Sequence, residues 1–323
     1  MMFPKPLLLL FSIAVLVPGL HGIFFTIDYT YDDANFFGAG NPDGSTAGTQ
    51  AKAALEQAAS DLEGLFEDDF SAINPGGPNT WTATFFDPED SGTTLNATDL
   101  SIAQDEILVY AGGSALAGTV AGRGGPGGFS ASGVPSFLAS VKRNQAGYDT
   151  TTPSNSTDFG PWGGSITFDN DGSTGFHYDH TSSVGSGLID FYSVALHELV
   201  HVLGFGTCAC HENLVDSGNN WTGSGANTEF GGSVPMQNST GDHFNEGVMS
   251  VALSDGAAQE TLMDPTITAG TRKEMTYLDL LAMVDAGWES SVTPIPEAGH
   301  FGFVAGVLAL VLLARRVRSA DKG

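Results

Sequence analysis

The residues best suited to chemistry lie close together in an apolar stretch, where His197, Glu198 and His201 form the pattern H-E-x-x-H. A helix turns by about 100° per residue, so side chains four positions apart lie on the same face. Two imidazoles in that arrangement can bind one zinc ion, and the glutamate beside the first can accept a proton from metal-bound water. The alternative is a buried helix without a metal, but burying three unpaired ionisable groups is costly. The pattern therefore favours a zinc site with Glu198 as the general base.

The element that must position these residues is a helix within residues 190–206. Asp190 is suited to the N-cap, apolar residues fill most of the following positions, and Gly204 is suited to end the helix. Cys208 and Cys210 follow directly, and they could form a small-ring disulfide, bind a metal or simply occupy a turn. Because these are the only two cysteines, the fold must depend mainly on its core for stability.

The composition is that of a large acidic globular protein. The chain of 323 residues is long enough for one large domain or two modest ones, and its net charge is -26. Such an acidic surface repels nucleic acid and anionic membranes, so no nucleic-acid partner is expected. The 43 glycines occur beside plentiful aromatic residues, which indicates many turns and long loops rather than disorder.

Local patterns predict further elements along the chain. Aromatic and β-branched residues predict strands at 23–31, 80–86, 106–111 and 162–169, and alanine-rich spacing predicts a helix at 47–70. The glycine-rich residues 112–133 are expected to form a long surface loop. Asp169 and Asp171 lie in an acidic turn and are candidates for a calcium site, although such turns are more often only solvated.

The two ends of the chain resemble sorting signals. Residues 1–22 have the positive end, the apolar run and the small-residue exit of a secretory signal peptide. Near the other end, Pro296-Glu297-Ala298 precedes an apolar run at residues 301–314 and three arginines. This arrangement resembles the PEP-CTERM sorting signal of Gram-negative bacteria. The resemblance implies an exosortase-type sorting enzyme as a partner, delivery to the cell surface or extracellular matrix, and membrane contact only through residues 292–323 before processing. A simple C-terminal anchor is the alternative.

The order of strand, helix, several strands and metal-binding helix resembles the upper lobe of the metzincin metallopeptidases. The resemblance implies an α+β fold of the zincin type, with a mixed twisted sheet, an active-site helix and a mostly irregular and helical C-terminal lobe. It divides residues 23–291 into an upper lobe at about 23–206 and a lower lobe at about 207–291. It also implies that the last strand before the helix, for which residues 163–168 are the candidate, is a sheet edge along which extended substrate binds.

A catalytic zinc usually needs a third protein ligand. The shorter metzincin pattern would place a histidine at position 207, which is Thr207 here. Residues 213–240 have the composition of an inserted loop, and the segment that follows, with its Asp-x-Gly-Trp ending at 285–288, resembles the leishmanolysin-like branch of the family. On this match His243 is the third ligand, and Met263 lies in a methionine turn beneath the zinc.

Other residues remain as alternatives for these two roles. His211 is the runner-up for the third ligand, whereas His177 and His180 are expected to be loop residues. Met249 is less suited to the methionine turn than Met263, because no Asp-Pro sequence follows it.

These features predict an exported, surface-sorted zinc endopeptidase that acts on protein or peptide substrates. A non-catalytic surface or matrix protein on the same scaffold is the main alternative, and a zinc hydrolase of another substrate class is a third. The intact Glu198 favours an enzyme, because a degenerate site tolerates the loss of its base first.

Overall fold

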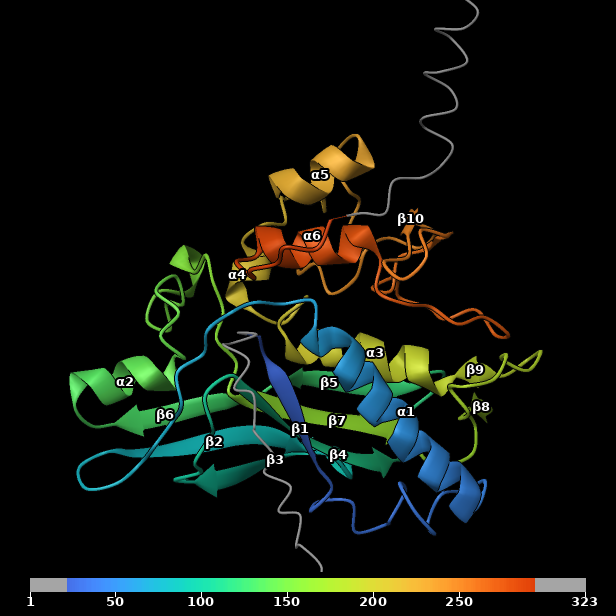
Figure 1. The fold of residues 1–323 in the computed structure, drawn as a ribbon, viewed down its shortest axis with the longest axis horizontal. Coiled ribbons are helices and arrows are strands. Elements are labelled where there is room, and N and C mark those ends of the chain that lie inside the picture. The colour runs from blue at the N-terminus through green and yellow to red at the C-terminus, as the bar shows by residue number, and fades with distance from the viewer. Residues whose placement is uncertain (1–21, 294–323) are drawn as a thin grey trace, which may run out of the picture.

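The computed structural model describes residues 22–293, which form a mixed α+β fold (Figure 1). The strands are β1 (Phe24–Asp28), β2 (Thr80–Asp87), β3 (Asp90–Thr98), β4 (Glu106–Ser114), β5 (Gly122–Pro126), β6 (Gly128–Ser132), β7 (Gly163–Asp169), β8 (Phe176–His177), β9 (Ile189–Asp190), β10 (Met249–Val251) and β11 (Ala258–Glu260). The helices are α1 (Ser45–Glu63), α2 (Pro135–Val141), the 3-10 helix η1 (Pro153–Asn155), α3 (Phe191–Val202), α4 (Ala209–Glu212), α5 (Ser224–Phe230) and α6 (Tyr277–Asp285).

The expected signal peptide at 1–22 and sorting signal at 292–323 lie almost wholly outside the described residues. Within residues 22–293, no helix is both long enough and apolar enough to cross a membrane.

The central element is a four-stranded sheet with the order β1-β4-β7-β5. β1, β4 and β7 run parallel, and β5 runs antiparallel to β7. Parallel strands inside a sheet are covered on both faces, and all seven residues of β7 are buried. The prediction that residues 163–168 form the edge of the sheet is therefore wrong, because β7 has a partner on each side. The edge strands are β1 and β5, and β5 is the one that packs against α3.

Each face of this sheet is covered by a different layer. Successive side chains of a strand point to opposite faces, and β4 shows this clearly. Its residues Ile107 and Val109 join the core beneath α1 and α3, whereas Tyr110 stacks on Phe85 of β2 in a second core cluster. The second cluster lies against a three-stranded antiparallel sheet with the order β3-β2-β6.

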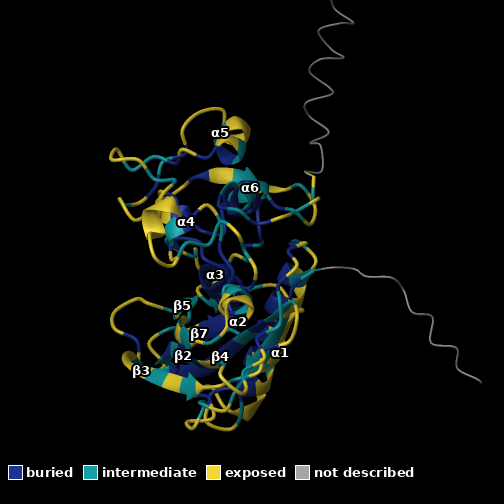
Figure 2. Ribbon diagram, turned by 90° about the vertical axis from the view of Figure 1, so that its left-hand side faces the viewer, coloured by how far each residue is buried: buried dark blue, intermediate teal, exposed yellow. Residues whose placement is uncertain are grey.

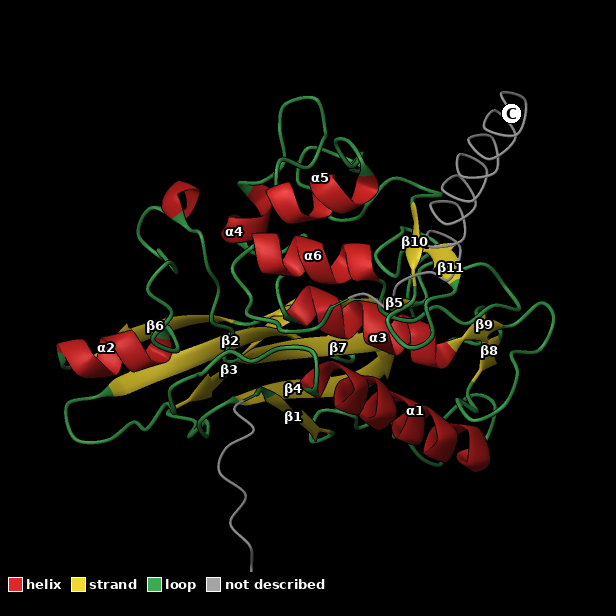
Figure 3. Ribbon diagram, turned by 45° about the horizontal axis from the view of Figure 1, so that its top comes forward, coloured by secondary structure: helices red, strands yellow, loops and turns green. Residues whose placement is uncertain are grey.

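The helices α1 and α3 lie together over the first face (Figure 3). Alanines on the buried face of α1, including Ala51, Ala54 and Ala58, let it pack closely. The helix predicted at 47–70 is thus confirmed, but it ends at Glu63, before Gly64.

The glycine-rich residues 112–133 are not the long surface loop that the composition suggests. They contain the end of β4 and the whole of β5 and β6. Glycine is needed in β5 because this strand packs directly against α3. A Cβ atom on Gly124 would lie only 2.4 Å from the carbonyl oxygen of Glu198, and one on Gly122 would lie 2.8 Å from Val194. The small residues bring the edge of the sheet close to the metal-binding motif.

Residues 207–293 form a second lobe, made of short helices, turns and the β10–β11 hairpin. Figure 2 shows α3 buried between this C-terminal lobe and the sheet lobe formed by residues 22–206. Inside the C-terminal lobe, Asp285 at the end of α6 accepts hydrogen bonds from the amides of Gly225 and Ala226 at the start of α5, and from the indole of Trp221. The expected mostly irregular and helical C-terminal lobe is present.

Candidate metal centre

The helix α3 is fixed at both ends, which sets the position of the H-E-x-x-H motif. Asp190 is the N-cap, and its carboxylate accepts from the amide of Ser193 at 3.1 Å. The same buried carboxylate forms an ion pair of 2.8 Å with Arg272 of the C-terminal lobe. After Leu203 the chain turns through Gly204, whose φ of 112° is a conformation that L residues rarely adopt. The N-cap and the terminating glycine were both predicted from the sequence.

Three histidines converge on one point between the lobes. The Nε2 atom of His197 lies 3.1 Å from that of His201 and 3.1 Å from that of His243, and the last two atoms are 3.3 Å apart. In residues 22–293 this is the only group of three or more imidazole, thiolate or carboxylate side chains close enough to hold a metal ion. The predicted convergence of these three histidines is confirmed.

Each ring is oriented by a hydrogen bond on its other nitrogen. The Nδ1 atom of His197 lies 2.9 Å from the carbonyl oxygen of Leu262, and that of His201 lies 2.8 Å from the carbonyl oxygen of Phe205. The Nδ1 atom of His243 lies 3.2 Å from the side-chain oxygen of Gln237. Because an oxygen without a proton can only accept, these contacts assign the proton to Nδ1 in each ring. All three Nε2 atoms therefore present lone pairs to the same point.

Electrostatics keep these imidazoles neutral. Burial, reinforced by the neighbouring histidines, lowers the pKa of His197 well below its ordinary value and that of His201 to about 4. Burial also lowers the pKa of His243. At neutral pH the site therefore consists of three facing lone pairs without a donor among them, an arrangement that is costly unless a cation occupies the centre.

The spacing of the three nitrogens suits a small ion such as zinc. Zinc–nitrogen bonds of about 2.0–2.1 Å at tetrahedral angles separate two ligand nitrogens by about 3.4 Å. The three observed separations are 3.1–3.3 Å. Neutral imidazoles whose other nitrogen donates to an oxygen are also the usual form of histidine in such sites. The residues present fit a bound zinc ion.

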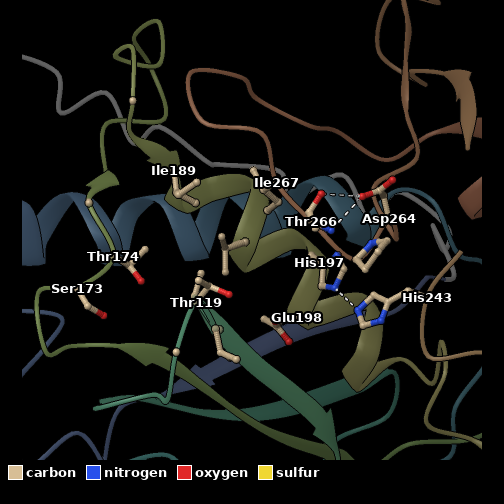
Figure 4. A pocket seen from close by; sticks show the side chains of 18 residues that line it. Thr119, Ser173, Thr174, Ile189, His197, Glu198, His243, Asp264, Thr266 and Ile267 are labelled. Atoms are coloured by element: carbon tan, nitrogen blue, oxygen red, sulfur yellow. Dashed lines mark hydrogen bonds between the residues drawn. The ribbon is translucent and has the colours of Figure 1, made fainter. Parts of the chain in front are cut away.

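Glu198 lies beside this centre, in the wall of a cavity of about 640 Å³ (Figure 4). Its side chain is buried, and burial raises its pKa to about 8, while the amide of Gly124 and the charge of Arg123 oppose this shift. Figure 4 shows its carboxyl group facing the same space as the rings of His197 and His243.

The rest of the cavity is formed mostly by apolar and hydroxyl side chains. They come from the segment before β5, from the region of β9 and the start of α3, and from the segment after the Leu262–Met263 turn. The main examples are Thr119, Val120, Ile189, Val194, Thr266 and Ile267. Asp264, which pairs with Lys273 at 3.5 Å, adds a carboxylate to this lining.

His211, the runner-up for the third ligand, does not reach the centre. It is fully buried between the rings of Phe205 and Trp221, with centroid distances of 4.3 and 4.5 Å. Cys208 and Cys210 form a disulfide with each other, and the Cys208 sulfur also accepts from the amide of His211. Of the three alternatives for these cysteines (a disulfide, metal ligands or turn residues), the small-ring disulfide is confirmed, and the sulfurs are not metal ligands.

The structure separates the remaining candidates in the same way. Met263 is fully buried in the turn whose Leu262 carbonyl orients His197, whereas Met249 is 52% exposed in β10. His177 is not the loop residue that the sequence suggested, because it ends β8, where it contacts Ser182 away from the three-histidine group. His180 offers its backbone carbonyl to Arg272.

The carboxylates of Asp169 and Asp171 accept hydrogen bonds from backbone amides and do not converge on an ion site. The Asp169 carboxylate accepts from the amides of Leu116 and Thr174, and Asp171 accepts from the amide of Ser173. Within the described part of the chain, no third imidazole, thiolate or carboxylate joins them in a metal-binding group. The calcium assignment therefore stays a prediction without support from the geometry.

Some residues of the site were not found from the sequence. Gln237, Phe205 and Leu262 orient the histidines, the last two through backbone carbonyls that carry no sequence signal. Gln237 lies in the segment expected to be an inserted loop, and only the folded structure places it beside His243.

Comparison of the chain with protein-family models, with curated proteins and with solved structures finds no match. The case for function therefore depends on the geometry of the site.

Proposed function

We propose that this protein is a zinc-dependent endopeptidase of the metzincin type. The observation that carries the proposal is the convergence of three neutral imidazoles, two from α3 and one from the C-terminal lobe, beside the buried carboxyl group of Glu198. Three protein ligands with room left beside them are typical of catalytic rather than structural zinc sites, which are usually closed by four.

The roles of the chain's own residues follow from this arrangement. His197, His201 and His243 would hold the zinc ion, which supplies Lewis-acid activation of a water molecule and of the scissile carbonyl. In its ionised form, which the positive charge of a bound zinc ion would favour against the effect of burial, Glu198 is placed to accept a proton from the attacking water and to return it to the leaving amine. Met263 would shape the floor of the site without binding the ion.

The edge strand β5 supports an extended peptide as the substrate. Within residues 22–293, β7 pairs with one side of β5 and no strand pairs with the other. Gly122 belongs both to β5 and to the wall of the cavity, so a peptide added alongside the strand would pass directly by the metal centre. The cavity, whose lining is mostly apolar and hydroxyl side chains with Asp264 among them, would then receive one substrate side chain.

Export and surface sorting remain part of the proposal on sequence grounds alone. They depend on the signal-like residues 1–22 and the PEP-CTERM-like residues 292–323, with an exosortase-type enzyme as partner.

The deciding experiment compares casein cleavage by the wild-type protein and by Glu198→Gln. We expect the variant to lose at least about 100-fold in kcat/KM, since general acid–base catalysis contributes on that scale, while its zinc content stays the same. Glu212→Gln, which changes an exposed glutamate outside the cavity, is the control and should cleave normally. Zinc binding without cleavage by any form would favour a non-catalytic matrix protein or a hydrolase of another substrate class.

A further inference from the structure

We propose that Asp279, on α6, is a positioning residue of the metal centre. It acts through one dipeptide, Leu262–Met263, whose carbonyl groups bond the ring of His197 and the backbone amide that follows His243. The inference depends on the proposed metal centre but not on the hydrolysis of peptides.

The carboxylate of Asp279 is fully buried, and it accepts four hydrogen bonds from Leu262, Met263 and Thr276. Its Oδ2 atom accepts from the amide of Leu262 at 2.8 Å, and its Oδ1 atom accepts from the amide of Met263 at 3.0 Å. Oδ2 also accepts from the amide and the hydroxyl group of Thr276, at 2.9 and 2.6 Å. Asp279 is thus the N3 residue of a capping box on α6 and, at the same time, the anchor of a distant turn.

The anchored dipeptide reaches the metal centre through both of its carbonyl groups. The Leu262 carbonyl accepts from Nδ1 of His197 at 2.9 Å, which sets the rotation of that ring. The Met263 carbonyl accepts from the amide of Phe244 at 2.9 Å, which fixes the backbone directly after His243. One carboxylate therefore anchors the turn that orients the His197 ring and that holds the backbone next to His243.

No helix or strand holds the Leu262–Met263 turn in place of Asp279. Leu262 and Met263 lie in a turn, outside every strand and helix, and the Asp279 oxygens are the hydrogen-bond partners of both amides. If the carboxylate is replaced by an amide, one oxygen becomes an NH₂ group that must face an N–H donor, so at least one buried amide loses its partner. The turn would then shift, and the two carbonyl groups with it.

The test measures metal binding in Asp279→Asn, with Asp285→Asn as a matched control. Asp285 lies on the same helix and likewise binds two backbone amides, but those amides belong to α5 and do not lead to a histidine ligand. By chelator competition we expect Asp279→Asn to bind zinc about 10- to 100-fold more weakly, the usual effect of losing an outer partner of a metal ligand. Asp285→Asn should lose stability and keep its zinc affinity.

A second readout separates positioning from general destabilisation. The visible absorption of the cobalt-loaded protein should change in Asp279→Asn and stay the same in Asp285→Asn. A folded Asp279→Asn with wild-type zinc affinity and an unchanged cobalt spectrum would overturn the proposal.

If Asp279→Asn does not fold, hydrogen exchange in the wild-type protein decides. The amides of Leu262 and Met263 should be protected in the metal-free form as strongly as in the zinc-bound form. Protection that arises only with zinc would show that the ion, and not Asp279, orders the turn. A wild-type protein that binds no zinc would instead refute the metal centre itself, while protection of the two amides in the metal-free protein would still show that the turn is ordered without an ion.

Discussion

Zinc should stabilise the folded protein through all three histidines, and replacing His243 should remove that effect. At a free zinc concentration 100 times the dissociation constant, binding to the native state alone adds about 2.7 kcal/mol to the free energy of unfolding. For a protein of this size, 1 kcal/mol raises Tm by roughly 2–4 °C. We therefore expect an increase of roughly 5–10 °C between chelator-treated and zinc-loaded wild-type protein.

The loss in His243→Ala follows from the same relation. His243 supplies one of three nitrogens that lie 3.1–3.3 Å apart, so its removal leaves two ligands for the ion. If affinity falls about a thousandfold, the same zinc concentration stabilises the variant by less than about 0.1 kcal/mol, and Tm no longer responds.

The assay is thermal unfolding followed by circular dichroism, with and without zinc, for the wild type, His243→Ala and His211→Ala. The His211→Ala variant should unfold at a lower temperature, because it leaves a cavity between Phe205 and Trp221, yet it should keep most of its zinc response. A full zinc response in His243→Ala, or none in the wild type, would refute the assignment of the ligands.

Three further predictions concern the stability of the fold. In urea unfolding, Gly124→Ala should lose about 1–3 kcal/mol because its Cβ atom would meet the backbone of α3, whereas Gly125→Ala, with open space around it, should change little. Burial raises the pKa of Asp68 to about 7, so the folded protein binds a proton there more tightly than the unfolded chain does. The free energy of unfolding is therefore highest below about pH 4, and the part that depends on this proton is lost as the pH rises through 7. Asp68→Asn should therefore be more stable than the wild type at pH 8, by up to about 4 kcal/mol, and the two should converge below pH 4. Arg272→Ala should lower the free energy of unfolding by on the order of 2 kcal/mol in a denaturant titration, because it leaves the buried Asp190 carboxylate without its ion-pair partner. The loss is smaller than for a fully buried pair because the arginine is partly exposed. An unchanged stability would mean that the Asp190 carboxylate does not depend on Arg272.

The sequence predicted best what is local. A helix places residues four apart on one face whatever the rest of the chain does, so His197 and His201 could be paired without a structure. Asp190 and Gly204 could likewise be assigned to the two ends, because capping depends on a few neighbouring residues. His243 could be predicted as a ligand only from the family resemblance, because it lies more than 40 residues after His197 and His201 and no local pattern brings it to the helix.

The wrong predictions concern strands β5 and β7, whose roles depend on the elements packed around them and not on their own residue pattern. β5 is built largely from glycine and carries no alternation of side chains, because its inner face must allow α3 to approach. β7 alternates Ile166 and Phe168 with Ser165 and Thr167, which is typical of a half-exposed strand, yet both hydroxyl groups are buried and lack a hydrogen-bond partner in the described chain. The role of Asp279 could be predicted only in part, since its capping box is local but its contact with residues 262–263 is not.

The division of the three histidines between α3 and the C-terminal lobe has a consequence for how tightly an ion is retained. A molecule lying along β5 and touching residues 264–267 would contact both sides of the cavity and favour the arrangement in which all three nitrogens meet. Coupling between two binding events is reciprocal, so such a molecule should slow the removal of the ion by a chelator, and the ion should in turn strengthen its binding.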